Sequence, residues 1–284
     1  MKLLRFNDDR LGVLLGEQVA DVSQALEVLP GHRYPLPRHD VLIAHLDRVR
    51  AEIDRLLPHA PRLPLAGLHL LSPVANPGKL VAAPVNYVKH LQEVLGDPNL
   101  HHQNRIDQIQ RAGLFLKATS SLVGISAGVQ LVLPERRTDH EVELAVVIGR
   151  TAKNVTAADA LQYVAGYSIG LDITIRGPEE RSLRKSPDSY SLLGPCLVTA
   201  DELPQPGALA MALSVDGVQR QSSNTSDLIL GVPELIEFAS RFYTLHPGDV
   251  IYTGTPEGVG PIQGGEEIQA RIEGIGEIRV QVRA

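Results

Sequence analysis

Tryptophan is absent from this chain of 284 residues, and all aromatic residues together make up only 4% of it. Aliphatic side chains must therefore fill most of the core, and a share of 43% apolar residues is enough for a large one. The single cysteine, Cys196, excludes an internal disulfide, which fits a reducing cytoplasm. Because Cys196 lies among apolar residues, we expect a buried side chain rather than a nucleophile.

Long apolar runs and clusters of basic residues are also missing. No stretch approaches the roughly 18 apolar residues of a membrane-spanning helix, and charges appear too early in the first ten residues for a secretory signal. The net charge is −6 and no Lys/Arg stripe is present, which argues against nucleic acid as a partner. The sequence therefore predicts a cytoplasmic protein that binds neither membranes nor nucleic acids.

Two segments in the middle of the chain carry carboxylates at the spacing of strands. Residues 138–150 read T-D-H-E-V-E-L-A-V-V-I-G-R, a run rich in β-branched and aliphatic residues that ends at a glycine. On a strand, Glu141 and Glu143 project from one face about 7 Å apart, and they repel each other unless water or a cation lies between them. Residues 167–176 alternate as a second strand with Asp172 on its polar face. If both strands face one cavity, these carboxylates could bind Mg²⁺, Mn²⁺ or Ca²⁺.

Alternating glutamates on a strand also have a plainer interpretation, the solvated outer face of a sheet. The two segments, however, resemble the metal-binding core of the fumarylacetoacetate hydrolase family, in which D-x-E-x-E-L-x-V-V-I-G precedes G-Y-x-x-x-x-D-x-T-x-R. Further family motifs occur in the same order: N-Y-x-x-H-x-x-E at 86–93, F-L-K-x-x-S-S-L-V-G at 115–124, K-S-x-D at 185–188, L-G-P at 193–195, and P-G-D-V-I-x-T-G-T-P-x-G-V-G at 247–260. Together they cover most of the chain beyond its first quarter.

The resemblance implies a catalytic site with a metal ion, a water-activating pair, two lysines and three substrate contacts. The implied metal is Mg²⁺, with Mn²⁺ or Ca²⁺ as alternatives, and its ligands would be Glu141, Glu143 and Asp172. The implied catalytic residues are His90, Glu93, Lys117 and Lys185. The implied substrate-binding residues are Tyr87, Arg176 and Thr255.

The residues themselves leave other interpretations of this set open. His90 and Glu93 share one helical face, but an isolated H-x-x-E is more often a surface pair. Lys117 lies between apolar neighbours, which predicts a partly buried ammonium group that needs an anion. Residues 176–188 carry many charges and two prolines, so we predict a loop that brings Lys185 to the mouth of the cavity. A solvated basic loop would have the same composition.

The chemistry that the resemblance implies is hydrolysis of a carbon–carbon bond. A small keto acid, an acylpyruvate or related 1,3-dicarbonyl acid, would chelate the cation while basic residues offset its charge. Water activated by His90 would attack the distal carbonyl, and cleavage would release pyruvate, or a relative, and a carboxylic acid. A decarboxylase or a keto–enol isomerase would use the same metal–enolate chemistry. A metal-binding protein without catalytic activity is a third alternative.

Three departures from the family pattern lie at the substrate end of the predicted site. Gly177 replaces an acidic residue that commonly follows the arginine at position 176, and Leu183-Arg184 replaces a common Arg-Gly. Val88 and Lys89 stand where small or acidic residues are common. These changes leave the predicted metal ligands intact and put the identity of the substrate in doubt.

Strands dominate the expected structure and no βαβ alternation is present, which argues against a doubly wound sheet. The resemblance implies a mainly β fold, a mixed β-roll or β-sandwich of the fumarylacetoacetate hydrolase C-terminal type, and a homodimer. Residues 1–70 are expected to form a small N-terminal α+β domain with a proline-rich linker, and residues 71–284 the metal-binding catalytic domain. The polar residues 96–113 are expected to form either a mobile lid or an exposed loop and helix.

Two local predictions concern the chain on either side of the second carboxylate strand. The capping residues of 156–159 predict a helix that ends at Gly166. Asp216-Gly217 between two alternating runs predicts a hairpin over residues 208–219.

Overall fold

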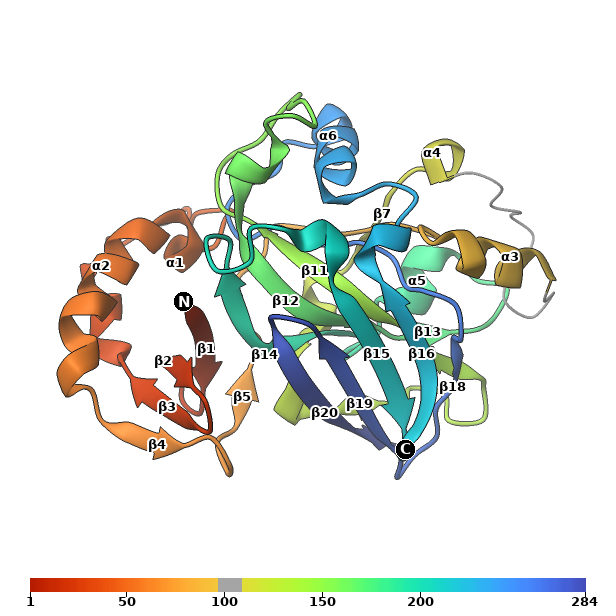
Figure 1. Ribbon diagram of the computed structural model, residues 1–284, viewed down its shortest axis with the longest axis horizontal. Coiled ribbons are helices and arrows are strands. Elements are labelled where there is room, and N and C mark those ends of the chain that lie inside the picture. The colour runs from red at the N-terminus through yellow and green to blue at the C-terminus, as the bar shows by residue number, and fades with distance from the viewer. Residues whose placement is uncertain (97–108) are drawn as a thin grey trace.

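The computed structural model describes residues 1–96 and 109–284, and strands form most of its regular structure (Figure 1). Within these residues the largest sheet has twelve strands. Its hydrogen-bonded path runs β4 (Arg62–Pro64), β3 (Gln18–Asp21), β2 (Arg10–Leu15), β1 (Lys2–Phe6), β14 (Ser191–Thr199), β12 (Val164–Asp172), β11 (Val142–Ile148), β17 (Val250–Tyr252), β6 (Leu80–Ala82) and β7 (Phe115–Lys117). Two short strands join it from the side, β5 (Leu70–Leu71) on β1 and β8 (Leu122–Gly124) on β14.

A second sheet of five strands packs against the middle of the first one (Figure 1). Its order is β16 (Val218–Asn224), β15 (Ala210–Val215), β19 (Glu267–Ile272), β20 (Gly276–Arg283) and β9 (Val129–Gln130). Side chains from the two facing surfaces, among them Leu144 and Leu213, share one hydrophobic core. The predicted hairpin is confirmed as β15 and β16, and its turn residues Asp216 and Gly217 have positive φ values of 47° and 76°.

The N-terminal strands continue the large sheet and carry two helices of their own, α1 (Val41–Ala44) and α2 (Leu46–Leu56). Helix α2 buries Leu46, Val49 and Ile53, which recur at the spacing of one helical face. The pairing of β1 with β14 joins this part to the rest of the molecule, with Lys2 opposite Val198. The division into two domains near residue 70 stays a prediction.

The two strands that carry the predicted metal ligands lie in the middle of this architecture. Every residue of β11 and β12 is buried, because one face of the sheet is covered by the second sheet and the other by a separate apolar core. Polar side chains on these strands are therefore enclosed by protein. The nearby Cys196 on β14 is fully buried, as predicted.

A third sheet and the remaining α-helices complete the described structure. A sheet of three short strands contains β13 (Thr174–Ile175), β10 (Thr138–His140) and β18 (Gly260–Pro261). The other α-helices of the described ranges are α3 (Val88–Gly96), α4 (Ile109–Ala112), α5 (Arg181–Lys185) and α6 (Val232–Phe242). No helix in residues 1–96 or 109–284 is long and apolar enough to span a membrane.

Two local predictions were wrong. The helix expected to end at Gly166 is a single 3₁₀ turn at Ala160–Tyr163, and Gly166 lies inside β12. A Cβ atom at Gly166 would lie 2.2 Å from the carbonyl oxygen of Val198, so this glycine permits close strand packing instead of ending a helix. The predicted loop 176–188 contains α5, whose first amide donates to the Glu180 carboxylate.

Most of the predicted lid, residues 97–108 of 96–113, lies outside the described residues.

Candidate active site

Three carboxylates meet in the interior, at the end of β12. Glu141, Glu143 and Asp172 each place one oxygen within 4.8 Å of the others. Their exposed fractions are 5%, 2% and 1%, so the solvated outer face of a sheet is excluded. Only a favourable partner makes such a group of buried charges stable.

Local backbone geometry brings these three side chains together. The strand expected from residue 138 to 149 is interrupted at Glu141, which lies between β10 and β11. The carbonyl oxygen of Glu141 accepts a hydrogen bond of 2.9 Å from the amide of Asp172, which fixes the two residues side by side. Glu143 lies opposite Gly170 on β12. A Cβ atom at Gly170 would lie 2.8 Å from the ring of Tyr252, so the glycine leaves room for that ring.

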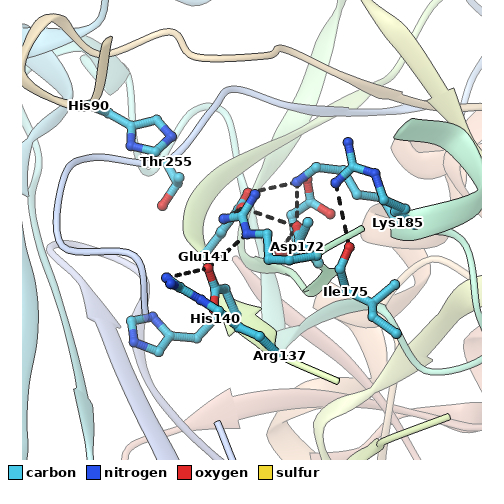
Figure 2. A network of polar contacts seen from close by, with 12 residues as sticks. His90, Arg137, His140, Glu141, Asp172, Ile175, Lys185 and Thr255 are labelled. Atoms are coloured by element: carbon cyan, nitrogen blue, oxygen red, sulfur yellow. Dashed lines mark hydrogen bonds and ion pairs between the residues drawn. The ribbon is translucent and has the colours of Figure 1, made fainter. Parts of the chain in front are cut away.

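Two buried lysines reach the carboxylates from different elements. The Lys117 ammonium group, from β7, donates to Asp172 Oδ1 at 2.5 Å and to the carbonyl oxygen of Tyr190 at 2.8 Å. It also lies 5.3 Å from the centre of the Tyr252 ring. The anion predicted for Lys117 is therefore confirmed as Asp172, and the side chain is fully rather than partly buried. Lys185, from α5, donates to Glu141 Oε2 and Asp172 Oδ2, both at 2.7 Å (Figure 2).

The two glutamates of the group have opposite pKa shifts. Burial acts to raise the pKa of Glu141, but the positive charges of Lys185 and Arg176 outweigh it and hold this pKa at about 2. Burial raises the pKa of Glu143 well above its usual range, and the neighbouring Asp172 charge adds to that shift. Glu143 accepts a hydrogen bond of 2.6 Å from the amide of Gly254. A bound cation would supply the positive charge that ionised Glu143 needs.

The donor set fits a hard divalent cation. All three groups offer carboxylate oxygens, which suit Mg²⁺, Mn²⁺ and Ca²⁺ better than Zn²⁺, a metal that favours nitrogen and sulfur. The raised pKa of Glu143 points in the same direction, because this carboxyl group lacks a basic side chain of its own among the described residues. The site can therefore hold a divalent metal ion.

Arginine side chains fix the outer end of the group. Asp139 is fully buried and accepts two hydrogen bonds from Arg137, of 2.7 and 3.0 Å. Arg176 donates to Asp139 Oδ2 at 2.8 Å and to Glu141 Oε1 at 3.2 Å. The guanidinium group of Arg176 therefore positions Glu141 through a charge-assisted bond.

His90 and Glu93 lie on α3, across the site from Lys185. Figure 2 shows His90 and Thr255 on one side of Glu141 and Lys185 on the other. His90 Nδ1 lies 2.8 Å from Glu93 Oε2, and the second oxygen of Glu93 accepts a bond of 3.1 Å from the amide of Gly258. Because His90 is only 5% exposed, an ordinary surface pair does not describe it. The arrangement leaves Nε2 of His90 for another partner.

Tyr87 is a predicted site residue whose hydroxyl group is bonded to a residue outside the predicted site. Its side chain is buried, and its hydroxyl donates to Met211 Sδ at 3.1 Å. Burial raises the pKa of Tyr87, and the Glu143 charge adds to the shift, so the ring lies within electrostatic reach of the carboxylates.

Gln221 is a part of the site that the sequence did not indicate. It lies on β16 and is 1% exposed. Its Nε2 donates to Thr255 Oγ1 at 2.8 Å and to the carbonyl oxygen of Pro256 at 2.9 Å. Its Oε1 accepts a bond of 3.0 Å from the amide of Val142, the residue between two predicted metal ligands. One side chain thus connects the Thr255 loop to the carboxylate strand.

Gly177, a departure from the family pattern, has a structural reason in this chain. A Cβ atom there would lie 1.6 Å from Nη2 of Arg136. That guanidinium group passes over the glycine, donates to the carbonyl oxygen of Arg176 at 2.7 Å and forms two bonds of 2.9 and 2.8 Å with Glu179. The missing side chain at position 177 makes room for an Arg136–Glu179 ion pair.

The fold and this site define a known family. The sequence profile described as "Fumarylacetoacetate (FAA) hydrolase C-terminal" matches residues 79–283, which is more than half of the chain. The chain belongs to the fumarylacetoacetate hydrolase family. The family predicted from the sequence motifs and the mainly β fold with some helices are therefore both confirmed.

Two of the relatives cover the whole chain. A protein of Aquipseudomonas alcaligenes named maleylpyruvate hydrolase is 59% identical over the full length of both chains. The crystal structure of maleylpyruvate hydrolase from Sphingobium sp. SYK-6, in complex with manganese(II) and pyruvate, has a TM-score of 0.84 at 39% identity, covering 100% of this chain and 99% of that one. A human mitochondrial protein named oxaloacetate tautomerase is 37% identical over 78% of this chain and 72% of its own length.

Proposed function

We propose that this protein is a divalent-metal-dependent hydrolase that cleaves the carbon–carbon bond of an acylpyruvate, with maleylpyruvate as the best candidate. The observation that carries the proposal is the meeting of a buried three-carboxylate group with a His–Glu pair in one site. Identity of 59% to a maleylpyruvate hydrolase over the whole chain supports both the reaction and the substrate. The prediction of an acylpyruvate hydrolase made from the sequence agrees with this relative.

The proposed metal ligands are Glu141, Glu143 and Asp172. Mg²⁺ and Mn²⁺ are the preferred ions, with Ca²⁺ as an alternative, because every donor is a carboxylate oxygen. A Sphingobium relative whose structure contains manganese and pyruvate supports a divalent ion as the cofactor. When bound, the ion supplies positive charge to the oxygens of the keto acid, where negative charge develops during cleavage.

The proposed role of His90 is to take a proton from the attacking water. If Nδ1 donates to Glu93, Nε2 is left as the acceptor, and the carboxylate of Glu93 stabilises the imidazolium that forms. The water oxygen bonds to the acyl carbonyl carbon, and the bond between this carbon and the pyruvate methylene breaks. The electron pair stays on the methylene, which gains a proton. One water and one maleylpyruvate thus give one maleate and one pyruvate.

Lys117 and Lys185 keep the site ionised and positively charged overall. Three carboxylates, two ammonium groups and a divalent cation sum to about one positive charge, which attracts a keto-acid anion. In the proposal, Thr255 is held by Gln221 with its hydroxyl toward the substrate. Arg176 contacts the substrate beside its bonds to Asp139 and Glu141, and Tyr87 contacts it through the ring, because its hydroxyl is bonded to Met211.

A keto–enol tautomerase is the second candidate function, because a human relative carries the name oxaloacetate tautomerase. Tautomerisation needs the metal ion and a proton carrier but no attack by water. Purified protein with Mn²⁺ or Mg²⁺ should be incubated with maleylpyruvate, acetylpyruvate and oxaloacetate, and the products followed by NMR. Formation of pyruvate and maleate supports the hydrolase. Enol–keto exchange of oxaloacetate without cleavage of either acylpyruvate would replace it with the tautomerase.

Two predictions from the sequence, on assembly and location, remain proposals. A homodimer is proposed from the family resemblance, and sedimentation would test it. A cytoplasmic location is proposed because the single cysteine excludes an internal disulfide.

A further inference from the structure

The inner face of α5 presents a second basic side chain beside Lys185. Arg181 precedes Lys185 by four residues, so the two share one face of the helix about one turn apart. Both cationic groups lie against the same ring: the guanidinium carbon of Arg181 is 5.2 Å and the ammonium nitrogen of Lys185 is 5.7 Å from the centre of Phe115. Arg181 is therefore directed to the side of α5 that holds the metal-site contacts of Lys185.

Arg181 differs from the other arginines around the site in what it contacts. The guanidinium groups of Arg136, Arg137 and Arg176 bind carboxylates, and that of Arg184 donates to the carbonyl oxygens of Glu179 and Ile175. Within residues 1–96 and 109–284, the Arg181 guanidinium has the Phe115 ring as its neighbour and no oxygen acceptor.

The surroundings of Arg181 favour an anionic partner. Burial lowers the pKa of its guanidinium group. The carboxylates of Glu180, Glu141 and Asp172 oppose that shift, so the group lies within electrostatic reach of two metal-site carboxylates. A partly desolvated guanidinium that lies against an aromatic ring keeps its N–H groups for a flat, bidentate anion such as a carboxylate.

The substrate of the proposed function carries a carboxylate that could bind the Arg181 guanidinium group. This step rests on the proposed function: maleylpyruvate has a keto-acid carboxylate, which belongs at the metal ion, and a second carboxylate at the far end of its acyl group. The amino groups of Lys117 and Lys185 already bind Asp172 and Glu141. We propose that Arg181 binds the distal carboxylate of a dicarboxylic acylpyruvate and so determines the preference of this enzyme for dicarboxylic over monocarboxylic substrates.

The test compares two substrates that share the keto-acid end, maleylpyruvate and acetylpyruvate, the latter without a distal carboxylate. In Arg181→Gln we expect kcat/KM for maleylpyruvate to fall roughly ten- to a hundredfold, mainly through KM, since a charged hydrogen-bonded pair is lost. The value for acetylpyruvate should change less than about threefold. Arg181→Lys, which keeps the charge but not the planar fork, should lie between the two.

Arg184→Gln is the matched control, a guanidinium removed from the same helix where it binds backbone carbonyls. It should affect both substrates alike. An equal loss for both substrates in Arg181→Gln would overturn the proposal, because Arg181 would then serve the shared keto-acid end or the fold. Unchanged kinetics with both substrates would overturn it too.

A binding measurement separates this proposal from the proposed function. If the wild-type protein cleaves neither compound, the hydrolase assignment fails, and both compounds become stable ligands for calorimetry with the Mn²⁺-loaded protein. Tighter binding of maleylpyruvate than of acetylpyruvate, with the difference removed in Arg181→Gln, would still support the distal carboxylate site. Equal binding of both compounds by the wild type would reject it.

Discussion

The carboxylate side of the site and the His90–Glu93 side are built in different ways. Glu143 and Asp172 lie on strands that are buried along their whole length. The Glu93 side chain, on the short helix α3, keeps 26% of its surface exposed. His90 itself is as buried as Glu141, at 5% exposure, so only its partner Glu93 connects this side to solvent. The two sides thus differ in their support, buried strands for the carboxylates and a short helix with a partly exposed carboxylate for His90.

Removal of the metal ion should have the largest effect and act on the carboxylate side alone. Excess chelator should abolish hydrolysis, and added Mg²⁺ or Mn²⁺ should restore it, because ionised Glu143 depends on a cation. Glu143→Gln should weaken metal affinity on calorimetry, since it removes one charge and keeps the shape. Full activity in chelator, with metal shown absent by elemental analysis, would refute the metal role.

His90→Ala should act on the other side alone. We expect kcat for hydrolysis to fall roughly a hundredfold or more, the usual contribution of a positioned general base. Metal affinity should stay within about twofold, because His90 is not a proposed ligand. Unchanged hydrolysis, with persistent exchange of the pyruvate methylene protons, would show that a different group activates the water. The contrast between the two sides would then be lost.

Gln221→Ala should weaken the connection between the sides. The change leaves the amide of Val142 and the hydroxyl of Thr255 without their partner, and such buried losses cost about 1–3 kcal/mol. We expect lower stability in urea and roughly tenfold slower hydrolysis, both in the same variant. Gln219→Ala, an exposed position on the same strand, is the control. Equal effects in both variants would mean that strand β16 matters rather than this side chain.

The smallest expected effect concerns the ion pair over Gly177. The hydrogen bonds from Arg136 lower the pKa of Glu179 to about 2, from an ordinary value of 4.5. A carboxyl group with a lowered pKa in the folded state adds stability above its unfolded pKa, and this contribution disappears as the pH falls from about 4.5 toward 2. Wild-type protein should therefore lose slightly more unfolding free energy than Glu179→Gln over this range. The difference between the two proteins should become smaller in high salt.

Sequence periodicity predicted the strands of the carboxylate side, and the family resemblance, rather than the spacing, selected their three carboxylates as metal ligands. Strands β11 and β12 appeared as aliphatic runs, and Glu141, Glu143 and Asp172 stood out because acidic residues in such runs need a partner. The break at Glu141 was not predicted, since it depends on pairing with β12 and β13. The helix expected before Gly166 was wrong because local capping residues cannot reveal how closely a distant strand approaches.

Gln221 shows why the connection between the sides could not be predicted. Its segment, V-Q-R-Q-S-S-N, reads as a polar edge strand, and its neighbours Gln219 and Arg220 are exposed. Only the folded chain brings this amide to Val142 and Thr255, which are 79 and 34 residues away in sequence. Arg181 was likewise not indicated, because the segment around it was expected to be a loop.

The buried Cys196 has a practical consequence for following motion at this site. Burial raises the pKa of its thiol to about 12, so near neutral pH it is neither ionised nor accessible to maleimide reagents. The natural protein can therefore serve directly as the background for dye labelling at introduced cysteines. Val88 on α3 and Leu183 on α5 are 53% and 63% exposed. A fluorophore pair at these two positions would report by energy transfer whether the two sides of the site approach each other when substrate binds.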